Sequence, residues 1–188
     1  MLSAEVAVMV APRSGFRRAA KPPAEGPWFA RPLLVVLVLS CCVSLMTAGR
    51  ITLRLALPAM VYGSVVPLLQ VGSLAVVCRG RLPFRRAVEL FFVGHGPWSL
   101  ALLAFAAAWG FAPASAMYAH PALTRLPFGV ALVWSLWIDY WFFREVAGGG
   151  GRRAIFDLAL QRVLAWGPGL LLFVAPAGWQ VVTSAVGR

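Results

Sequence analysis

The chain alternates between long apolar stretches and short segments rich in Arg, Gly and Pro. The apolar stretches predict five helices, at approximately 33–48, 55–77, 87–111, 126–146 and 158–182. A helix needs about 20 mostly apolar residues to cross a hydrocarbon core about 30 Å thick. The first stretch is slightly short for this, and the other four are long enough. The pattern therefore predicts an all-α fold, a polytopic membrane bundle of five transmembrane helices.

Composition supports this class, because the chain is 61% apolar and only 12% charged, with a mean hydropathy of +0.81. Soluble domains carry about 25% charged residues, so we expect lipid to cover much of the surface. Residues 1–31 form a basic, proline-rich head, for which an interfacial helix and a solvated irregular segment are equally good expectations. Residues 32–188 form the transmembrane domain.

The basic residues are divided unequally between the two sides that five spans would create. One side receives twelve of them, from the head (Arg13, Arg17, Arg18, Lys21, Arg31), the second connection (Arg79, Arg81, Arg85, Arg86) and the fourth connection (Arg144, Arg152, Arg153). The other side receives four, namely Arg50, Arg54, Arg125 and Arg188. Since cytoplasmic loops collect Lys and Arg, this split predicts the N-terminus in the cytoplasm and the C-terminus outside.

The net charge of +11 would favour nucleic acid in a soluble protein, but here orientation explains it and no nucleic-acid partner is expected. Clustered Arg side chains attract anionic lipid headgroups at about 1 kcal/mol per charge. We therefore expect a surface for lipid or a protein partner at Arg79, Arg81, Arg85, Arg86, Arg152 and Arg153. A homo-oligomer is an alternative partner.

Charged residues within apolar stretches are candidates for function, because they are costly in a bilayer. Asp139 lies in the fourth stretch and Arg162 in the fifth, at similar depths of an antiparallel hairpin. We expect them to form a buried ion pair that locks the hairpin; a proton or ion relay, and an Arg162 that reaches the headgroups alone, are the alternatives. On a helical wheel Trp134, Trp137 and Trp141 form a stripe opposite Asp139, which predicts a surface for lipid or a partner.

Three further polar residues lie in or beside the spans. Glu89 begins the third stretch and is expected to pair with a nearby Arg. His95, flanked by two glycines and followed by Pro97, is either a packed residue at a kink or a proton-binding group. Gln70 lies in the second stretch. The residues contain no catalytic motif, metal-ligand spacing or cofactor signature, so we expect no enzyme activity, metal or cofactor.

Several short motifs resemble the Yip type of five-span membrane proteins, the Ypt/Rab-interacting family and its bacterial relatives. They are PRSGF at 12–16, GRLPFR at 80–85, Gly94 with Pro97, WSL at 134–136, REVAG at 144–148 and Arg153-Ala154. The resemblance implies a five-helix bundle in the orientation given above. In eukaryotic members it implies vesicle traffic and GTPase binding through a longer head, which this chain lacks. The Ala-, Gly-, Arg- and Pro-rich composition is typical of a high-GC bacterium, so we expect the inner membrane of a bacterium.

Two functions remain open. The first is a non-catalytic interaction or organising protein, or complex subunit, at the cytoplasmic face. The second is a small-solute, ion or proton transporter or channel component that uses Asp139, His95 and the Pro-broken helices. A continuous polar path joining Asp139, His95 and Gln70 would favour transport, whereas a dry, tightly packed interior would favour organisation.

Overall fold

The computed structural model describes residues 3–21, 27–111 and 121–186, with the backbone alone beyond Leu171. Every regular element in these residues is a helix, so the all-α prediction is confirmed for them. The helices are α1 (Ala4–Val10), α2 (Pro12–Ala19), α3 (Ala30–Ala48), α4 (Leu53–Gly63), α5 (Val65–Val77), α6 (Phe84–Val93), α7 (Gly96–Phe111), α9 (Pro121–Glu145) and α10 (Gly151–Val186).

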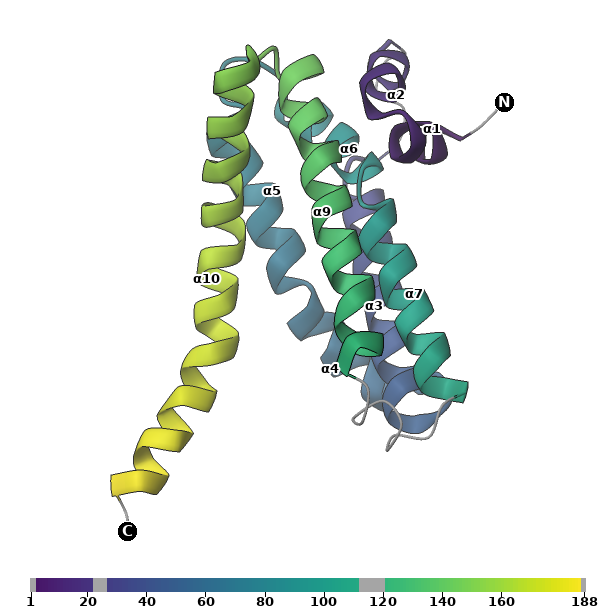
Figure 1. Ribbon diagram of the computed structural model, residues 1–188, viewed down its shortest axis with the longest axis vertical. Helices are drawn as coiled ribbons and strands as arrows, with labels where there is room; N and C mark the ends of the chain where they lie inside the picture. Colours follow the sequence, from purple (N-terminus) through teal and green to yellow (C-terminus); the bar gives the residue numbers. More distant parts are fainter. Residues whose placement is uncertain (1–2, 22–26, 112–120, 187–188) are drawn as a thin grey trace.

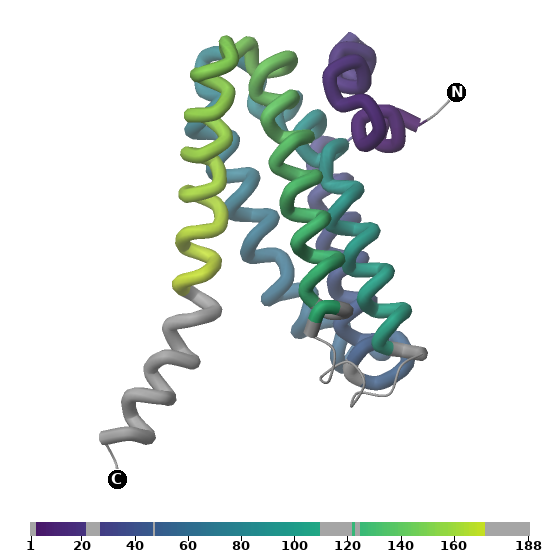
Figure 2. The backbone as a smooth tube through the Cα atoms, viewed as in Figure 1, coloured from purple at the N-terminus to yellow at the C-terminus, as the bar shows by residue number. Residues whose placement is uncertain are grey.

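The long helices run side by side as a bundle, and the two short helices α1 and α2 lie across one end of it (Figure 1). We call this the head end. The α5–α6 and α9–α10 connections also lie at the head end, while the α3–α4 connection lies at the opposite end (Figure 2). Neighbouring pairs are α3 with α4 and α7, α9 with α7 and α10, and α10 with α5. The head and the two most basic connections therefore share one end, as the charge pattern predicts.

Two of the expected spans are broken. The second consists of α4 and α5, which meet at Ser64 just before Pro67. The third consists of α6 and α7, which meet at Gly94 and His95 with a bend of 44°. Proline has no N–H for the preceding turn, so a break before it costs little. The fifth behaves differently, because α10 is one helix from Gly151 to Val186 and continues through Pro168.

The four glycines that end at Gly151 form the α9–α10 turn, and Gly148 has a φ of +71° there. Helix α10 begins seven residues before the apolar stretch that predicts it, at Gly151. Its first turns are polar and carry exposed Arg152 and Arg153 with buried Asp157. The length of the apolar stretch therefore underestimates the length of this helix.

Two helical segments among the described residues are long and apolar enough to cross a membrane, Leu53–Val77 and Arg125–Glu145. The bent pair Phe84–Val93 and Gly96–Trp109 makes a third if it counts as one span, and Ala30–Met46 is apolar but shorter. Large apolar side chains lie exposed on these helices, among them Leu34, Val61, Leu103 and Val133. An apolar surface this extensive is typical of a face that contacts lipid or protein.

The tightest apolar packing lies at the head end. Phe91, Phe142 and Phe143 are fully buried there, and the Phe91 and Phe142 rings lie 5.3 Å apart in an edge-to-face contact. The head joins this core, because the fully buried Phe16 of α2 lies 5.8 Å from Phe142 between ring centroids. Gly15 allows the turn, since a Cβ there would lie 2.7 Å from backbone atoms of Ala7 and Val8. The head is thus a packed part of the fold.

Candidate functional site

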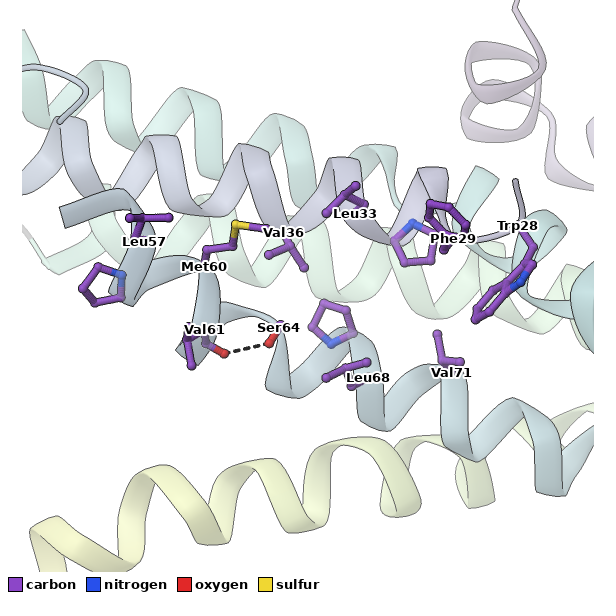
Figure 3. Close-up of a pocket in the computed structure, with 13 residues that line it drawn as sticks. Trp28, Phe29, Leu33, Val36, Leu57, Met60, Val61, Ser64, Leu68 and Val71 are labelled. Carbon is purple, nitrogen blue, oxygen red and sulfur yellow. Dashed lines mark hydrogen bonds between the residues drawn. The ribbon is translucent and has the colours of Figure 1, made fainter. Parts of the chain in front are cut away.

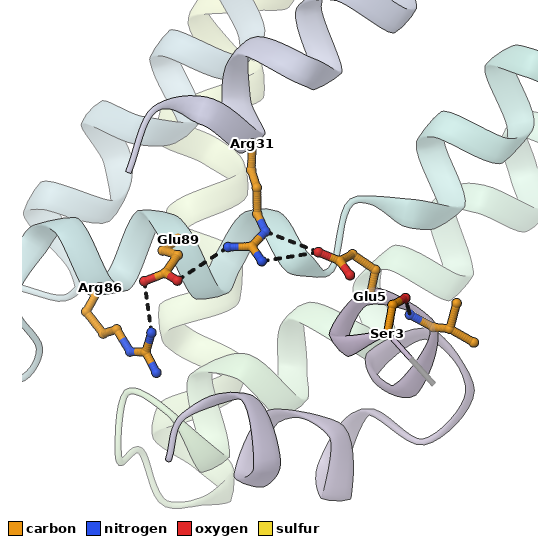
Figure 4. A network of polar contacts seen from close by, with 6 residues as sticks. Ser3, Glu5, Arg31, Arg86 and Glu89 are labelled. Atoms are coloured by element: carbon orange, nitrogen blue, oxygen red, sulfur yellow. Dashed lines mark hydrogen bonds and ion pairs between the residues drawn. The ribbon is translucent and has the colours of Figure 1, made fainter. Parts of the chain in front are cut away.

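A network of acidic and basic side chains ties the head to the bundle. The guanidinium of Arg31, at the start of α3, donates to Glu5 of α1 and to Glu89 of α6 at 3.2 and 3.4 Å (Figure 4). Arg86 donates to Glu89 at 2.8 Å and to the carbonyl of Ala19 in the head at 2.8 Å. The expected Glu89–Arg pair is present, but it belongs to a larger network that sequence spacing does not reveal.

A second set of contacts fixes the head to the end of α9. Arg13 and Arg17 of α2 donate to the two carboxylate oxygens of Glu145 at 3.1 and 2.7 Å. The guanidinium of Arg13 also lies 5.4 Å from the centre of the Trp141 ring, on which Arg144 packs as well, at 5.1 Å. Such cation–π contacts add about 0.5–1 kcal/mol each at exposed sites.

The tryptophan stripe of α9 faces the chain's own head. The indole N–H of Trp134 donates to the carbonyl of Met9 at 3.0 Å, and Trp141 lies under Arg13. Trp137, with 46% of its surface exposed, lines a shallow hollow between α9 and α2. The prediction that this stripe forms a surface for lipid or a partner is therefore wrong for Trp134 and Trp141, because the chain's own head covers them. The helical wheel gives a face but not what covers it.

The structure brings Asp139 and Arg162 together. The Nη2 of Arg162 donates to Asp139 and, at 3.2 Å, to the hydroxyl of Ser135 one turn away. Asp139 is 3% exposed and the Arg162 side chain 15% exposed. Because α9 and α10 are antiparallel neighbours, two residues at similar depth meet across the hairpin.

The sequence also does not predict the ion pair between Arg81 and Asp157. Arg81, in the α5–α6 connection, donates to Asp157 of α10 at 2.6 Å and also to the carbonyl of Val77. Arg81 and Arg86 are thus partly buried and engaged within the protein, which argues against their prediction as part of a surface for lipid or a protein partner. Arg79, Arg85, Arg152 and Arg153 are exposed. Asp157 adjoins the predicted span, so its lone charge was an available signal.

His95 lies at the α6–α7 bend and contacts Gln70 of α5. The His95 Nε2 and Gln70 Oε1 atoms lie 3.1 Å apart, and both residues are more than nine-tenths buried. The imidazole stacks on Phe92, with ring centroids 4.4 Å apart. The structure thus joins two of the three groups of the expected polar path. Among the described residues no hydrogen bond links this pair to Asp139.

Several buried polar atoms in this part of the bundle find no hydrogen-bond partner among the described residues. They are the Nδ1 of His95, the indole nitrogens of Trp98 and Trp166, both amide atoms of Gln161, and the Nε and Nη1 of Arg162. Buried polar groups are normally hydrogen-bonded, and each exception calls for an explanation. Sequence reasoning missed Trp98, Trp166 and Gln161, since a Trp or Gln in an apolar helix carries no distinctive signal.

A cavity of about 250 Å³ is lined by three of these residues, His95, Trp98 and Trp166. Helices α3, α4, α5, α7, α9 and α10 all contribute to its wall, and the polar residues Gln70, His95, Trp98 and Trp166 line it. It lies where the helices are interrupted, with Gly63 and Pro67 on one side and the His95 bend on another. Broken helices that meet at one site are a feature of transporter folds.

A larger, wholly different cavity opens between α3 and the α4–α5 helices. It measures about 650 Å³ and is lined almost entirely by apolar side chains, including Trp28, Phe29, Val36, Met60, Leu68 and Val71 (Figure 3). Ser64 is its polar exception, and the Ser64 hydroxyl donates to the carbonyl of Val61 at 2.7 Å. A cavity without free polar groups offers no means of recognising a specific solute.

Two groups outside the spans have shifted pKa values. Burial of Glu5 works to raise its pKa, but hydrogen bonds from its own backbone and from Arg31 prevail and lower the pKa below its ordinary value of 4.5. Burial raises the pKa of the Cys78 thiol to about 11, so this thiol is unreactive at neutral pH. No three His, Cys, Asp or Glu side chains in the described ranges are placed to hold a metal ion.

Comparison with known proteins yields no relative from which a function could be transferred. No family model, no curated protein and no solved structure matches the chain. The geometry described above is therefore the basis for assigning a function.

Proposed function

We propose that this chain is a five-span integral membrane protein of a bacterial inner membrane. Its N-terminus is in the cytoplasm and its C-terminus outside, and it is a non-catalytic organising protein of the Yip type. Its head end binds anionic lipid headgroups and so forms a basic platform at the cytoplasmic face. Gathering of the head and the two basic connections at one end supports this orientation (Figure 1).

One observation carries the proposal: the acidic groups are neutralised within the protein and the basic ones are left over. Each acidic side chain in the described ranges forms an ion pair with Arg; these are Glu5, Glu89, Asp139, Glu145 and Asp157. Seven basic side chains at the head end are exposed and join no ion pair within the same ranges, namely Arg18, Lys21, Arg79, Arg85, Arg144, Arg152 and Arg153. This end therefore presents uncompensated positive charge.

The free energy with which the platform binds anionic lipid depends on the number of its positive charges. Each Lys or Arg near an anionic leaflet contributes about 1 kcal/mol, and the attraction falls off within a Debye length of about 10 Å at 0.1 M salt. Removal of two such charges should therefore weaken binding of an anionic lipid by about 2 kcal/mol, or roughly thirtyfold. Added salt should weaken binding in the same direction.

The test compares two matched double variants of the detergent-purified chain, Arg152→Gln/Arg153→Gln at the head end and Arg50→Gln/Arg54→Gln at the opposite end. The measurement is the rise in thermal midpoint on titration with phosphatidylglycerol, with phosphatidylcholine as the neutral reference. We expect phosphatidylglycerol to stabilise the wild type and the Arg50/Arg54 variant, and to stabilise the Arg152/Arg153 variant much less. Equal responses from the two variants would refute the platform.

Orientation is tested separately with a membrane-impermeant maleimide on intact cells. Arg152→Cys should be labelled only after the membrane is opened, and Arg54→Cys in intact cells. The reverse pattern would overturn the proposed orientation.

A second candidate function, movement of a small solute, is favoured by the His95–Gln70 contact beside a cavity at the helix breaks. The broken path to Asp139 argues against a proton relay through all three groups.

A further inference from the structure

The cavity of about 650 Å³ between α3 and the α4–α5 helices, called the α3–α5 groove below, has two walls of the same residue spacing. Residues at positions i, i+3, i+4 and i+7 share one face of a helix. One wall is formed in this way by Phe29, Pro32, Leu33 and Val36, and the other by Ser64, Pro67, Leu68 and Val71 (Figure 3). Two helix faces therefore look onto one groove.

The helix break at Ser64 explains why these two faces are apart. Helix α4 packs along α3, whereas α5, beyond the break, packs mainly against α10. Trp28 and Phe29 lie at the head end of the groove, and Leu57 of α4 lies at its other end (Figure 3). The groove is therefore closed by α4 away from the head and widens toward the head end.

The surface of the groove is suited to hydrocarbon. Phe29, Leu33 and Leu68 are exposed, so the groove opens at the outside of the bundle. Its one side-chain hydroxyl, on Ser64, already donates to the carbonyl of Val61 at 2.7 Å. A polar ligand would lose its hydrogen bonds to water in such a groove, whereas a hydrocarbon chain loses none.

The dimensions of the groove favour a single chain over a protein helix. A helix is about 10–12 Å across with its side chains, so a 10 Å length of it takes up roughly 900 Å³. That exceeds the 650 Å³ of the groove. The stretch from Phe29 to Val36 spans about 10 Å along α3, which lies within the roughly 15 Å of hydrocarbon in one leaflet. One acyl chain of one leaflet therefore matches the groove.

The wide end of the groove carries positive charge. The Trp28 ring packs edge-to-face on Phe84, with centroids 5.5 Å apart, and Arg85 follows Phe84 in the chain. Arg79 lies just past α5, about two helical turns beyond Val71. Both arginines are exposed and join no ion pair among the described residues. The groove thus combines a hydrocarbon slot with cations at its mouth, which is complementary to an anionic phospholipid.

We infer that the α3–α5 groove holds one acyl chain of an anionic phospholipid from the leaflet at the head end, with the lipid phosphate beside Arg79 and Arg85. The inference rests on the proposed function, because it assumes membrane insertion and adds one defined lipid site to the basic platform. Charge alone attracts any anionic headgroup to the platform, whereas the groove retains one lipid through its chain.

The test is native mass spectrometry of the full chain released from detergent after titration with dioleoyl phosphatidylglycerol, which gives separate binding constants for the first lipid and for later ones. Dioleoyl phosphatidylcholine has the same chains without net charge, and glycerophosphoglycerol is the headgroup without chains. We expect the first phosphatidylglycerol to bind the wild type at least tenfold more tightly than either control and than the second phosphatidylglycerol.

Two variants fill the groove from opposite walls and remove no charge. Leu68→Trp on α5 and Leu33→Trp on α3 replace exposed side chains, so the fold tolerates them, and each should weaken the first binding constant about tenfold or more. Leu170→Trp is the matched control on α10, outside the groove, where 56% of the leucine is exposed against 65% of Leu68; it should leave the constant unchanged. Arg79→Gln/Arg85→Gln should weaken it roughly thirtyfold, at about 1 kcal/mol per charge.

Three results would each overturn the inference. One is the same first binding constant for Leu68→Trp, Leu33→Trp and Leu170→Trp. Another is binding of phosphatidylcholine or of glycerophosphoglycerol as tight as that of phosphatidylglycerol. The last is a dimer of the chain that Leu68→Trp abolishes, which would assign the groove to a second copy.

Failure of the groove is distinguishable from failure of the platform. Arg152→Gln/Arg153→Gln removes charge from the platform and leaves the groove intact. If this variant weakens lipid binding and the groove variants do not, the platform stands and the groove inference falls. If only the groove variants and Arg79→Gln/Arg85→Gln weaken it, the groove stands without the wider platform.

Discussion

Replacement of Asp139 by Asn tests whether the buried ion pair holds the α9–α10 hairpin together. The carboxylate of Asp139 is the counter-ion of Arg162 and is almost completely buried, with 4% of its side chain exposed. Asn keeps the size and one acceptor but removes the charge. Arg162 then remains buried without a counter-ion, and its Nε and Nη1 have no other partner among the described residues.

The magnitude follows from the burial of the pair. Removal of one partner from a buried ion pair costs about 3–5 kcal/mol, whereas replacement of both by neutral groups is often close to neutral. For a chain of 150–250 residues, 1 kcal/mol shifts the midpoint by about 2–4 °C. Asp139→Asn should therefore lower the thermal midpoint by about 6–20 °C. Asp139→Asn/Arg162→Gln should recover most of that loss.

The assay determines the apparent thermal midpoint in detergent from the amount of monodisperse protein that remains after heating. The heating rate is kept the same for every variant, because membrane proteins often unfold irreversibly. Glu145→Gln is the matched control: it also breaks a carboxylate–Arg contact, but its partners Arg13 and Arg17 are 56% and 57% exposed. Such surface pairs contribute about 0–1 kcal/mol. A midpoint for Asp139→Asn within the range of Glu145→Gln, or a double variant as unstable as the single one, would refute the ion-pair lock.

Two further predictions concern the head. Gly15→Ala should loosen the packing of the head at a cost of about 1–3 kcal/mol and speed cleavage of the head by trypsin, because the new methyl would lie 2.7 Å from backbone atoms of Val8. Gly72→Ala, which has open space around it, is the control, and equal cleavage of the two variants would contradict the packing of the head. Glu5→Gln should lower the thermal midpoint at pH 7, and this effect should disappear in acid. The pKa of Glu5 in the folded protein is lowered below 4.5, so its contact with Arg31 stabilises the fold above the ordinary pKa. That stabilisation is lost as the pH falls through the pKa of folded Glu5. A gap between the two proteins that persists well below pH 4.5 would show that charge is not its source.

The all-α class follows from the sequence alone, as do the approximate positions of the helices and the grouping of basic segments at one end. Each depends on local composition or on the order of elements along the chain. The Asp139–Arg162 contact follows as well, because an antiparallel hairpin with a short turn brings together residues at similar depths in its two helices. Such properties need no knowledge of how distant helices pack.

Tertiary structure alone decided what covers each surface and which polar groups are left over. Helix geometry predicts that the three tryptophans of α9 share one face, but only the packing of the head shows that the Trp134 indole donates a hydrogen bond to the carbonyl of Met9. Arg81 and Asp157 are 76 positions apart, and the α5–α10 packing makes them a pair. The rings of Trp98 and Trp166 lie 5.6 Å apart between centroids and line one cavity, because α7 and α10 come together there. Contacts of this kind arise from the packing of whole helices, which the pattern of apolar and polar positions does not specify.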